Sequence, residues 1–403
     1  MQWILLALRN LTRNRRRTAV TLAGLTIGIG AALVLQGFAT GIVTLIGGLM
    51  VEGRLGAVQV HKTGHLQADQ NALDFTLPDS AELRARLAAM PGVTAVAARL
   101  SFEATLGNGQ QSTLALVSAI EPVADRKVCP VRFANVIGKG IESTDKNGAV
   151  LGIRLAEGLR ALPGETLQLM ATGPDNRPNL LDLRVAGKLP ATTELDARRL
   201  VVVQLGYAQE LLQMPGRVTE YSLAINEFSQ ADKIAGQVQA ALGPDYQVVS
   251  WLDLLPQIRS VLGMLTVVMR VVVAVLLLLL ATAVANTMYM TVHERVREIG
   301  TMLALGVRRQ EVVRLLVSEA ILLGILGSCL GVAAGTLLVY CLQTHGVTLR
   351  APGADVESQL RPSISALAVV GTALLALVAT ALAAAGPAWR AAKLSPVECL
   401  RAT

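Results

Sequence analysis

Four long stretches without Asp, Glu, Lys or Arg constrain this chain more than any other feature of its sequence. One follows the basic segment that ends at Arg17, and the other three fall in or near the last third of the 403 residues. A helix rises about 1.5 Å per residue, so about 20 apolar residues cross the hydrocarbon core of a bilayer. Transmembrane helices are therefore predicted at residues 22–49, 271–292, 320–349 and 362–389.

The composition agrees with a membrane protein that carries one large water-soluble domain. Hydrophobic residues make up 52% of the sequence and charged residues only 16%, outside the usual range of soluble domains. Residues 52–259, between the first and second apolar stretches, have an ordinary mixed composition. We predict an α-helical membrane protein in which four transmembrane helices, in a one-plus-three arrangement, flank a large α+β extracytoplasmic domain between helices 1 and 2.

Basic residues gather in three segments that alternate with the apolar stretches. They are Arg9, Arg13, Arg15, Arg16 and Arg17 before the first stretch, Arg295, Arg297, Arg308, Arg309 and Arg314 between the second and third, and Arg390, Lys393 and Arg401 after the fourth. Short loops rich in Lys and Arg stay in the cytoplasm, so we expect both termini there and the large domain outside. The net charge of +7 then reflects topology, and no nucleic-acid partner is expected.

These patterns divide the chain into segments. They are residues 1–17, an amphipathic helix at the cytoplasmic surface; 18–49, transmembrane helix 1; 50–255, the external α+β domain; 256–290, a stalk and transmembrane helix 2; 291–307, a short cytoplasmic helix; 308–343, transmembrane helix 3; 344–362, an external loop; 363–389, transmembrane helix 4; and 390–403, a cytoplasmic tail. A plain basic flank is the alternative for the first segment. The first apolar stretch exceeds the roughly 7–15 residues of a cleaved secretory signal, so it is expected to stay as an anchor.

Small residues predict close helix packing inside the membrane. Gly324, Gly327, Gly331 and Gly335 form an edge of the third apolar stretch, and such edges allow helices to approach closely. The sequence leaves open which helix packs there.

The external domain alternates strand and helix patterns. Residues 93–106 and 112–120 flank Gly107-Asn108-Gly109 and predict a β-hairpin. Asp79-Ser80 is expected to cap a helix that ends near Met90. A boundary between two lobes is expected near residues 123–146.

Catalytic and metal-binding patterns are not evident in the sequence. His61 and His65 are four residues apart, but Lys62-Thr63-Gly64 between them lacks the glutamate of a metalloprotease motif, and two ligands are too few for zinc. No phosphate-binding Gly-x-x-x-x-Gly-Lys-Ser/Thr sequence occurs. We therefore expect no catalytic residue, metal or cofactor in this chain.

The most specific cytoplasmic segment lies between the second and third apolar stretches. Val292, Val296, Ile299 and Leu303 recur at helical spacing and are expected to face the membrane. Charged residues point elsewhere, and Gly306 is expected to end the helix. On periodicity alone, a solvated charged loop that only fixes topology remains the alternative.

Three segments of this chain resemble a known superfamily. They are the run from Glu294 to Gly306, Glu319 with the glycine-rich stretch after it, and the ending from Pro387 to Arg401. Together with the order of spans, they are similar to the FtsX/MacB/LolC-LolE superfamily of ABC-transporter permeases. Two segments of the external domain look most like the LolC/LolE lipoprotein-release branch: Gly64-His65-Leu66-Gln67, and Val150-Leu151-Gly152 with Leu155-Ala156.

The resemblance implies mechanotransmission, in which a separate ABC ATPase, present in two copies and binding ATP and Mg, moves the external domains through the membrane helices. Residues 291–307 would then be the coupling helix that docks on the ATPase. Its expected coupling residues are Glu294, Arg295, Arg297, Glu298, Gly300, Ala304, Leu305 and Gly306. A second permease, identical or paralogous, would complete the complex. Candidate cargo-lining residues are Phe38, Ile42, Leu45, Met264 and Val268, although these side chains are also compatible with facing lipid.

Several functions remain open on this resemblance. The favoured one is extraction of lipoprotein or other amphiphilic cargo from a bacterial inner membrane, with membrane lipid and a periplasmic carrier or adaptor as further partners. A MacB-like peptide or antibiotic efflux permease and an FtsX-like regulator of a periplasmic partner are the alternatives. Residues 174–178 and 188–198 are the loops expected to bind a carrier.

Overall fold

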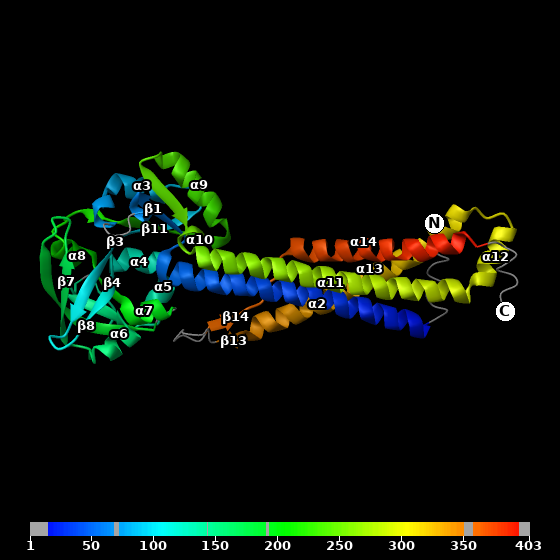
Figure 1. Cartoon of the computed structure of the whole chain (residues 1–403), viewed down its shortest axis with the longest axis horizontal. Coiled ribbons are helices and arrows are strands. Elements are labelled where there is room, and N and C mark those ends of the chain that lie inside the picture. The colour runs from blue at the N-terminus through cyan, green and yellow to red at the C-terminus, as the bar shows by residue number, and fades with distance from the viewer. Residues whose placement is uncertain (1–14, 68–71, 143, 191–192, 350–357, 395–403) are drawn as a thin grey trace. The chain divides into compact units, whose positions relative to one another are not determined.

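The computed structural model describes residues 15–67, 72–142, 144–190, 193–349 and 358–394. Most of the predicted N-terminal helix, residues 1–17, and of the tail, residues 390–403, lies outside these ranges. The chain divides into two compact units. We call residues 1–43, 262–347 and 360–403 the helical unit, and residues 44–261 and 348–359 the α/β unit. Figure 1 labels their elements.

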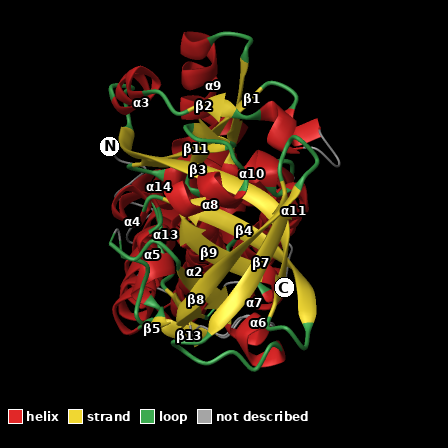
Figure 2. Ribbon diagram, turned by 90° about the vertical axis from the view of Figure 1, so that its left-hand side faces the viewer, coloured by secondary structure: helices red, strands yellow, loops and turns green. Residues whose placement is uncertain are grey.

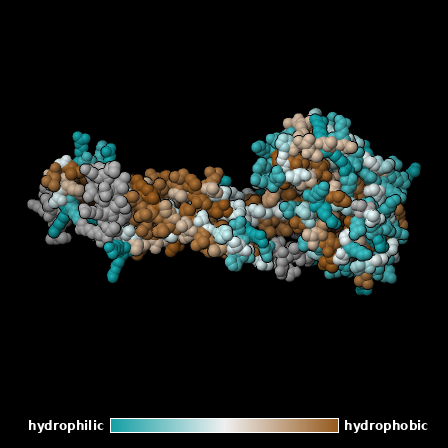
Figure 3. Space-filling model, turned by 180° about the vertical axis from the view of Figure 1, so that it is seen from behind, coloured by the Kyte–Doolittle hydropathy of each residue, from teal (hydrophilic) through white to brown (hydrophobic). Residues whose placement is uncertain are grey.

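The helical unit is built from long apolar helices. They are α2 (Arg15–Met50), α11 (Pro256–Glu294), α13 (Arg309–His345) and α14 (Ala366–Ala392), and the short α12 (Val296–Ala304) lies between α11 and α13. All four long helices have the length and composition to cross a membrane. Figure 3 shows a hydrophobic band over these helices on the face in view.

The glycine edge of α13 packs against two neighbouring helices. A β-carbon added at Gly331 would lie 2.8 Å from the β-carbon of Ile29 on α2, and one at Gly335 would lie 3.0 Å from the α-carbon of Gly30. A β-carbon at Gly324 would lie 3.2 Å from Thr380 on α14. The predicted close packing is therefore confirmed, and α2 and α14 are the partners that the sequence left open.

Helix α11 is the least covered of the four long helices. Only 6% of its most apolar window is buried, compared with 33% in α2 and in α13. Met264 and Leu278 are 69% and 67% exposed. Among the residues that the structure describes, one long apolar face of α11 therefore has few protein contacts over most of its length.

The α/β unit is built around a ten-stranded sheet (Figure 2). Its strands are β1 (Val58–Lys62), β3 (Val93–Gly107), β4 (Ser112–Ile120), β5 (Ile137–Gly138), β6 (Gly148–Gly152), β7 (Thr166–Thr172), β8 (Pro178–Leu189), β9 (Leu200–Gln204), β11 (Glu220–Ile225) and β12 (Tyr246–Ser250). The strand order is β12-β1-β11-β3-β4-β9-β6-β8-β5, and β7 pairs with both β3 and β8. The pairs β4/β9 and β6/β8 are parallel.

Helices and short strands complete both units. The helices of the α/β unit are α3 (Ala81–Ala88), α4 (Pro122–Val128), α5 (Pro130–Ala134), α6 (Ile153–Gly158), α7 (Glu194–Arg199), α8 (Leu205–Leu211), α9 (Ala231–Leu242) and α10 (Trp251–Leu254), with the π-helical turn η1 (Val51–Leu55) and the 3-10 turns η2 (His65–Gln67), η3 (Ala72–Phe75) and η4 (Phe228–Gln230). Two small sheets pair β2 (Leu77–Pro78) with β10 (Arg217–Val218) and β13 (Val347–Leu349) with β14 (Ser358–Leu360).

The long strand β3 forms the predicted hairpin with β4, in which Gly107 pairs with Ser112. The side chain of Asn108 closes the turn by accepting hydrogen bonds from the backbone N–H groups of Gln110 and Gln111. The first part of β3 pairs with β11, and its last residues also pair with β7.

Other predictions for this domain need correction. The boundary expected near residues 123–146 is wrong, because α4, α5 and β5 occupy that region and the domain is one compact unit. Ser80 caps α3 by accepting a hydrogen bond from the N–H of Leu83, and the helix ends at Ala88, so this prediction is confirmed to within two residues. The segment 188–198 is not a free loop, since it contains most of α7.

Candidate functional site

The short helix α12 begins where α11 breaks. Arg295 has φ −111° and ψ 16°, which is not helical, and α12 starts at the next residue. The buried Ile299 packs in an apolar cluster with Val292 of α11 and residues of α13 and α14. The apolar spacing seen in the sequence therefore faces the other helices, and α12 is fixed to the end of the helical unit.

Arg295 is buried, unlike the other charged residues predicted for ATPase coupling, and its Nε lies 4.0 Å from Oε2 of Glu298. Its Nη1 donates to Oε2 of Glu319 on α13 at 3.2 Å, and the two side chains are 9% and 5% exposed. Two charges this deeply buried must neutralise one another. Arg295 therefore joins α12 to α13, and its part in ATPase coupling stays a prediction.

Glu294 joins the ends of α2 and α11. Nη1 of Arg17 donates to Oε2 of Glu294 at 2.7 Å, and Nη2 donates to the hydroxyl of Thr291 at 2.7 Å. One turn along, the hydroxyls of Thr21 and Thr287 are 3.2 Å apart. The first helix is thereby tied to the helix that leads into α12.

The face of α12 that does not pack against the other helices is accessible to solvent. Arg297 and Ala304 are exposed, and the Glu298 side chain is 48% exposed. Leu305, the residue that follows α12, is 85% exposed, the largest exposed fraction among the large apolar residues described. Gly306 then adopts φ +88°, which favours glycine, and redirects the chain. Gly300 is buried, so its place is in the packing of α12 and not on this surface.

The second candidate feature lies in the α/β unit, where four charged side chains are buried together. Nε of Arg99 on β3 donates to Oδ1 of Asp125 on α4 at 2.6 Å, and Nη1 of Arg132 on α5 donates to Oδ2 at 3.2 Å. Asp125 is 0% exposed and Arg99 2%. Glu220 on β11 lies 3.9 Å from Arg99. Burial opposes the guanidinium charge, but nearby anionic groups, Asp125 foremost, raise the pKa of Arg99.

This cluster grips the end of the helix that starts at Arg15. Arg99 donates to the carbonyl oxygen of Arg54 at 2.8 Å, and Arg132 donates to the same oxygen at 2.6 Å. The thiol of Cys129 donates to the carbonyl of Val51 at 3.2 Å. Carbonyl groups at a helix end lack partners within the helix. We call Arg99, Asp125, Cys129 and Arg132 the helix-end clamp.

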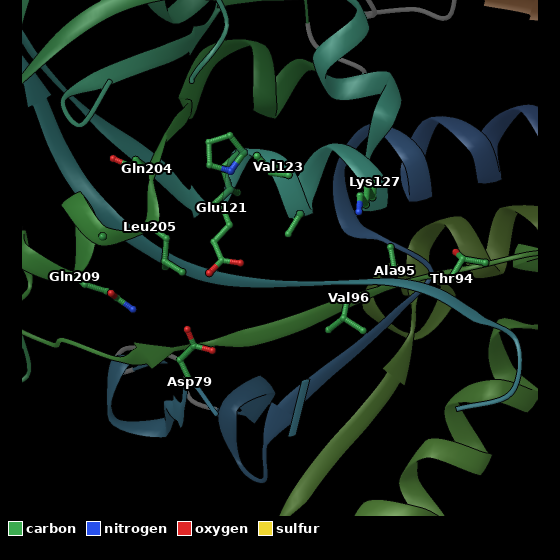
Figure 4. A pocket seen from close by; sticks show the side chains of 14 residues that line it. Asp79, Thr94, Ala95, Val96, Glu121, Val123, Lys127, Gln204, Leu205 and Gln209 are labelled. Carbon is green, nitrogen blue, oxygen red and sulfur yellow. The ribbon is translucent and has the colours of Figure 1, made fainter. Parts of the chain in front are cut away.

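A cavity of about 620 Å³ opens on the α/β unit between β3, α4 and α8. Asp79, Glu121 and Gln209 point toward it from different elements (Figure 4). Arg84 donates two hydrogen bonds to each carboxylate, at 2.6 to 2.7 Å. The hydrogen bonds from Arg84 to Glu121 and to Asp79 raise the pKa of the guanidinium. Both carboxylates are therefore paired with the guanidinium of Arg84, whereas a catalytic acid and base pair needs carboxylates that are free to exchange protons.

The histidine pair is structural. Its rings stack with centroids 4.8 Å apart. Nδ1 of His61 is 3.2 Å from the carbonyl of Thr219, and Nε2 is 3.0 Å from Oε1 of Gln59, so both nitrogens face protein groups. Burial lowers the pKa of His61 to about 4, which Glu220 partly opposes. In the described part of the chain, no group of three or more His, Cys, Asp or Glu side chains is arranged to hold a metal.

The predicted cargo-lining residues lie on two helices. Phe38, Ile42 and Leu45 are half-buried on α2, whereas Met264 and Val268 are exposed on α11 by 69% and 42%. Their exposure alone does not distinguish contact with cargo from contact with lipid, so cargo lining stays a prediction.

An exposed apolar row crosses the sheet of the α/β unit. Thr105 on β3 pairs with Leu114 on β4 and with Met170 on β7, and Met170 pairs with Leu180 on β8. Residues opposite one another in neighbouring strands share a face. Leu114, Met170 and Leu180, 42%, 45% and 52% exposed, therefore form one row, which the sequence analysis missed.

Four membrane-length helices and a folded α/β unit between the first and second of them define a multi-pass membrane protein. Two family profiles cover most of its length. Residues 18–241 match the MacB-like periplasmic core domain, and residues 270–396 match the FtsX-like permease C-terminal domain. The chain belongs to the FtsX/MacB/LolC family of ABC-transporter permeases.

Individual relatives differ in length and described role. An uncharacterised ABC transporter permease of Methanocaldococcus jannaschii is 25% identical over 274 residues, 66% of this chain and 64% of that protein. The lipoprotein-releasing system transmembrane protein LolC of Xylella fastidiosa is 24% identical over 419 aligned positions, covering 99% and 98%. The macrolide export ATP-binding/permease protein MacB of Hyphomonas neptunium is 24% identical, covering 98% of this chain and 60% of that protein. This chain therefore spans less than two thirds of two of these relatives.

Proposed function

We propose that this chain is the permease subunit of an ABC transporter and converts ATP hydrolysis by a partner ATPase into motion of its α/β unit. The subunit itself is non-catalytic, and ATP and Mg are bound by the partner. It lies in a bacterial inner membrane with both termini cytoplasmic and the α/β unit in the periplasm. The basic segments beside α2, α12 and α14 support this orientation.

The observation that carries the proposal is the construction of α12. One face is fixed by Ile299 and by the Arg295–Glu319 ion pair, and the other presents Glu298 and the exposed Leu305. One face of α12 is packed against the helical unit and the other is exposed to a partner. A protein that binds the exposed face and displaces α12 would therefore also displace α11 and α13. Arg297, Glu298, Ala304 and Leu305 are the contact residues that we propose for the ATPase.

Helix α2 is the element that we propose carries the motion from α12 to the α/β unit. It is continuous from Arg15 to Met50, is tied to α11 through Arg17 and Glu294, and is followed directly by the η1 turn that the helix-end clamp holds. A displacement along α2 therefore pulls on the clamp and on β3.

The exposed apolar face of α11 supports a second permease copy or paralogue in the complex. The two permeases would bind two ATPases, and cargo would enter from the outer leaflet. It would reach the candidate cargo-lining residues Phe38, Ile42, Leu45, Met264 and Val268. Coverage of nearly all of LolC favours lipoprotein release, and the row Leu114, Met170 and Leu180 is the surface that we propose for a periplasmic carrier. MacB-like efflux and FtsX-like regulation are the alternatives.

The test uses the complex reconstituted with its ATPase in vesicles. Glu298→Lys should abolish stimulation of ATP hydrolysis by cargo, because it reverses a charge on the accessible side of α12. Glu157→Lys, an exposed glutamate of α6, makes the same charge change in the α/β unit and should leave stimulation intact. Leu305→Glu should reduce co-purification of the ATPase. Normal stimulation in Glu298→Lys and normal ATPase binding in Leu305→Glu would refute the proposed docking surface.

Cargo is tested separately. Vesicles that contain a triacylated lipoprotein should release it to a soluble carrier only when ATP is present. Release that requires no acyl chains on the cargo would favour the efflux alternative.

A further inference from the structure

A basic groove lies in the helical unit where α13 begins and α14 ends. It has a volume of about 520 Å³, within the roughly 300–1,000 Å³ of small-molecule sites. Arg309 and Arg314 line it from α13, and Trp389 and Lys393 line it from α14. The apolar lining comes from Val313 and Ala392.

The groove concentrates the positive charge of three basic side chains, Arg309, Arg314 and Lys393. Within the described residues, none of the ion pairs found includes Arg309, Arg314 or Lys393. The nearest acidic side chain in sequence, Glu311, accepts a hydrogen bond from the backbone N–H of Arg308 at the start of α13. Arg309 is also the first residue of a 37-residue helix, and the N-terminal end of a helix carries partial positive charge.

The aromatic residue of the groove, Trp389, indicates that the groove lies at the level of the lipid headgroups. Trp389 is 60% exposed and lies near the end of α14, and Nζ of Lys393 lies 3.6 Å from the centre of its ring. Tryptophan at the end of a transmembrane helix sits at the level of lipid headgroups. A groove lined by cations, an aromatic ring and apolar side chains therefore matches an amphiphile with an anionic head.

We propose that this groove binds the phosphate headgroup of an anionic phospholipid, with Arg309, Arg314 and Lys393 contacting the phosphate and Trp389 packing beside the glycerol region. The site differs from the ATPase contact on α12 and from the proposed cargo residues, and it does not depend on either. Basic pockets between membrane helices hold anionic headgroups in this way. Bound lipid would brace α13 against α14 next to α12.

The experiment measures phospholipid binding to the purified full-length chain by native mass spectrometry in detergent, with phosphatidylglycerol or phosphatidylcholine added. The natural chain should retain phosphatidylglycerol in preference to phosphatidylcholine. The double variant Arg309→Gln, Arg314→Gln should bind phosphatidylglycerol about 30-fold more weakly, as expected for two basic contacts. Val313→Phe, which fills the groove without changing its charge, should also weaken binding.

The matched control is the double variant Arg15→Gln, Arg16→Gln, which removes two exposed charges from the start of α2. It should change binding less than about threefold; an equal loss would mean general attraction of lipid to a basic surface and would overturn the proposal. Displacement of phosphatidylglycerol by millimolar inorganic phosphate would also overturn it, since the site would then be one for free phosphate. Normal lipid binding by the groove variant, together with lost ATPase association, would assign the groove to a protein contact instead.

Discussion

Replacing Asp125 with alanine tests whether the helix-end clamp stabilises the α/β unit. Asp125 is the carboxylate shared by Arg99 and Arg132, and its two contacts measure 2.6 and 3.2 Å at a site with 0% exposure. Without it, two guanidinium groups stay buried while Glu220, 3.9 Å from Arg99, is the remaining carboxylate described nearby. Removal of one partner from a buried pair costs about 3–5 kcal/mol. We expect a loss in that range.

Trp251 provides the readout, because it lies in the α/β unit and is 2% exposed. The other tryptophans, Trp3 and Trp389, are replaced by phenylalanine in all variants, and urea unfolding of the full chain in detergent is followed by fluorescence. With a urea dependence of about 2 kcal/mol/M, Asp125→Ala should lower the midpoint by about 2 M.

The control for this measurement is Asp232→Ala, which removes a partner of Arg259 in a pair whose side chains are 49% and 53% exposed. Exposed pairs contribute about 0–1 kcal/mol, so its midpoint should move by less than about 0.5 M. A loss below about 1 kcal/mol in Asp125→Ala, or equal shifts in the two variants, would show that the buried cluster does not stabilise the fold as argued.

Three further changes test other parts of the structure. Gly331→Ala should lower the thermal stability of the chain in detergent, because the new β-carbon would lie 2.8 Å from α2, whereas Gly371→Ala, with no atom within 4 Å, should not. Glu319→Ala should cost about 2–5 kcal/mol by leaving a buried guanidinium, measured as earlier unfolding in SDS. The pKa of His61 falls from 6.5 to about 4 in the folded chain, so the unfolded state binds the extra proton and stability should fall as the pH drops from 6.5 to 4. Urea unfolding at each pH measures this loss of unfolding free energy. His61→Asn should make the loss between pH 6.5 and 4 smaller by about 3 kcal/mol. The control His65→Asn should keep most of the loss.

Elements set by local pattern were predictable from the sequence. The apolar stretches are long enough to determine helices whatever their neighbours, and the hairpin of β3 and β4 has its turn residues at the right place. Helices α4 and α5 were missed because both are short and α4 is rich in charge, so the segment resembles a linker. Pro122 and Pro130 at their first positions are the available signal.

The candidate site was less predictable because its decisive contacts join residues far apart in sequence. Arg295 belongs to a charged run, and only the contact with Glu319 turns it inward. The signal was Glu319 itself, since an ionisable residue next to an apolar stretch requires a partner. Nothing in the sequence distinguishes Arg99 and Asp125 from other charged residues, because only the packing of α4 on the sheet brings them into contact.

Strand β3 has a mechanical consequence. Its early residues are hydrogen-bonded to β11 and its later residues to β4 and β7, while Arg99 near the middle is held by the clamp. Bending the sheet between these regions would break several backbone hydrogen bonds of β3 at the same time. The sheet of the α/β unit should therefore resist bending along β3.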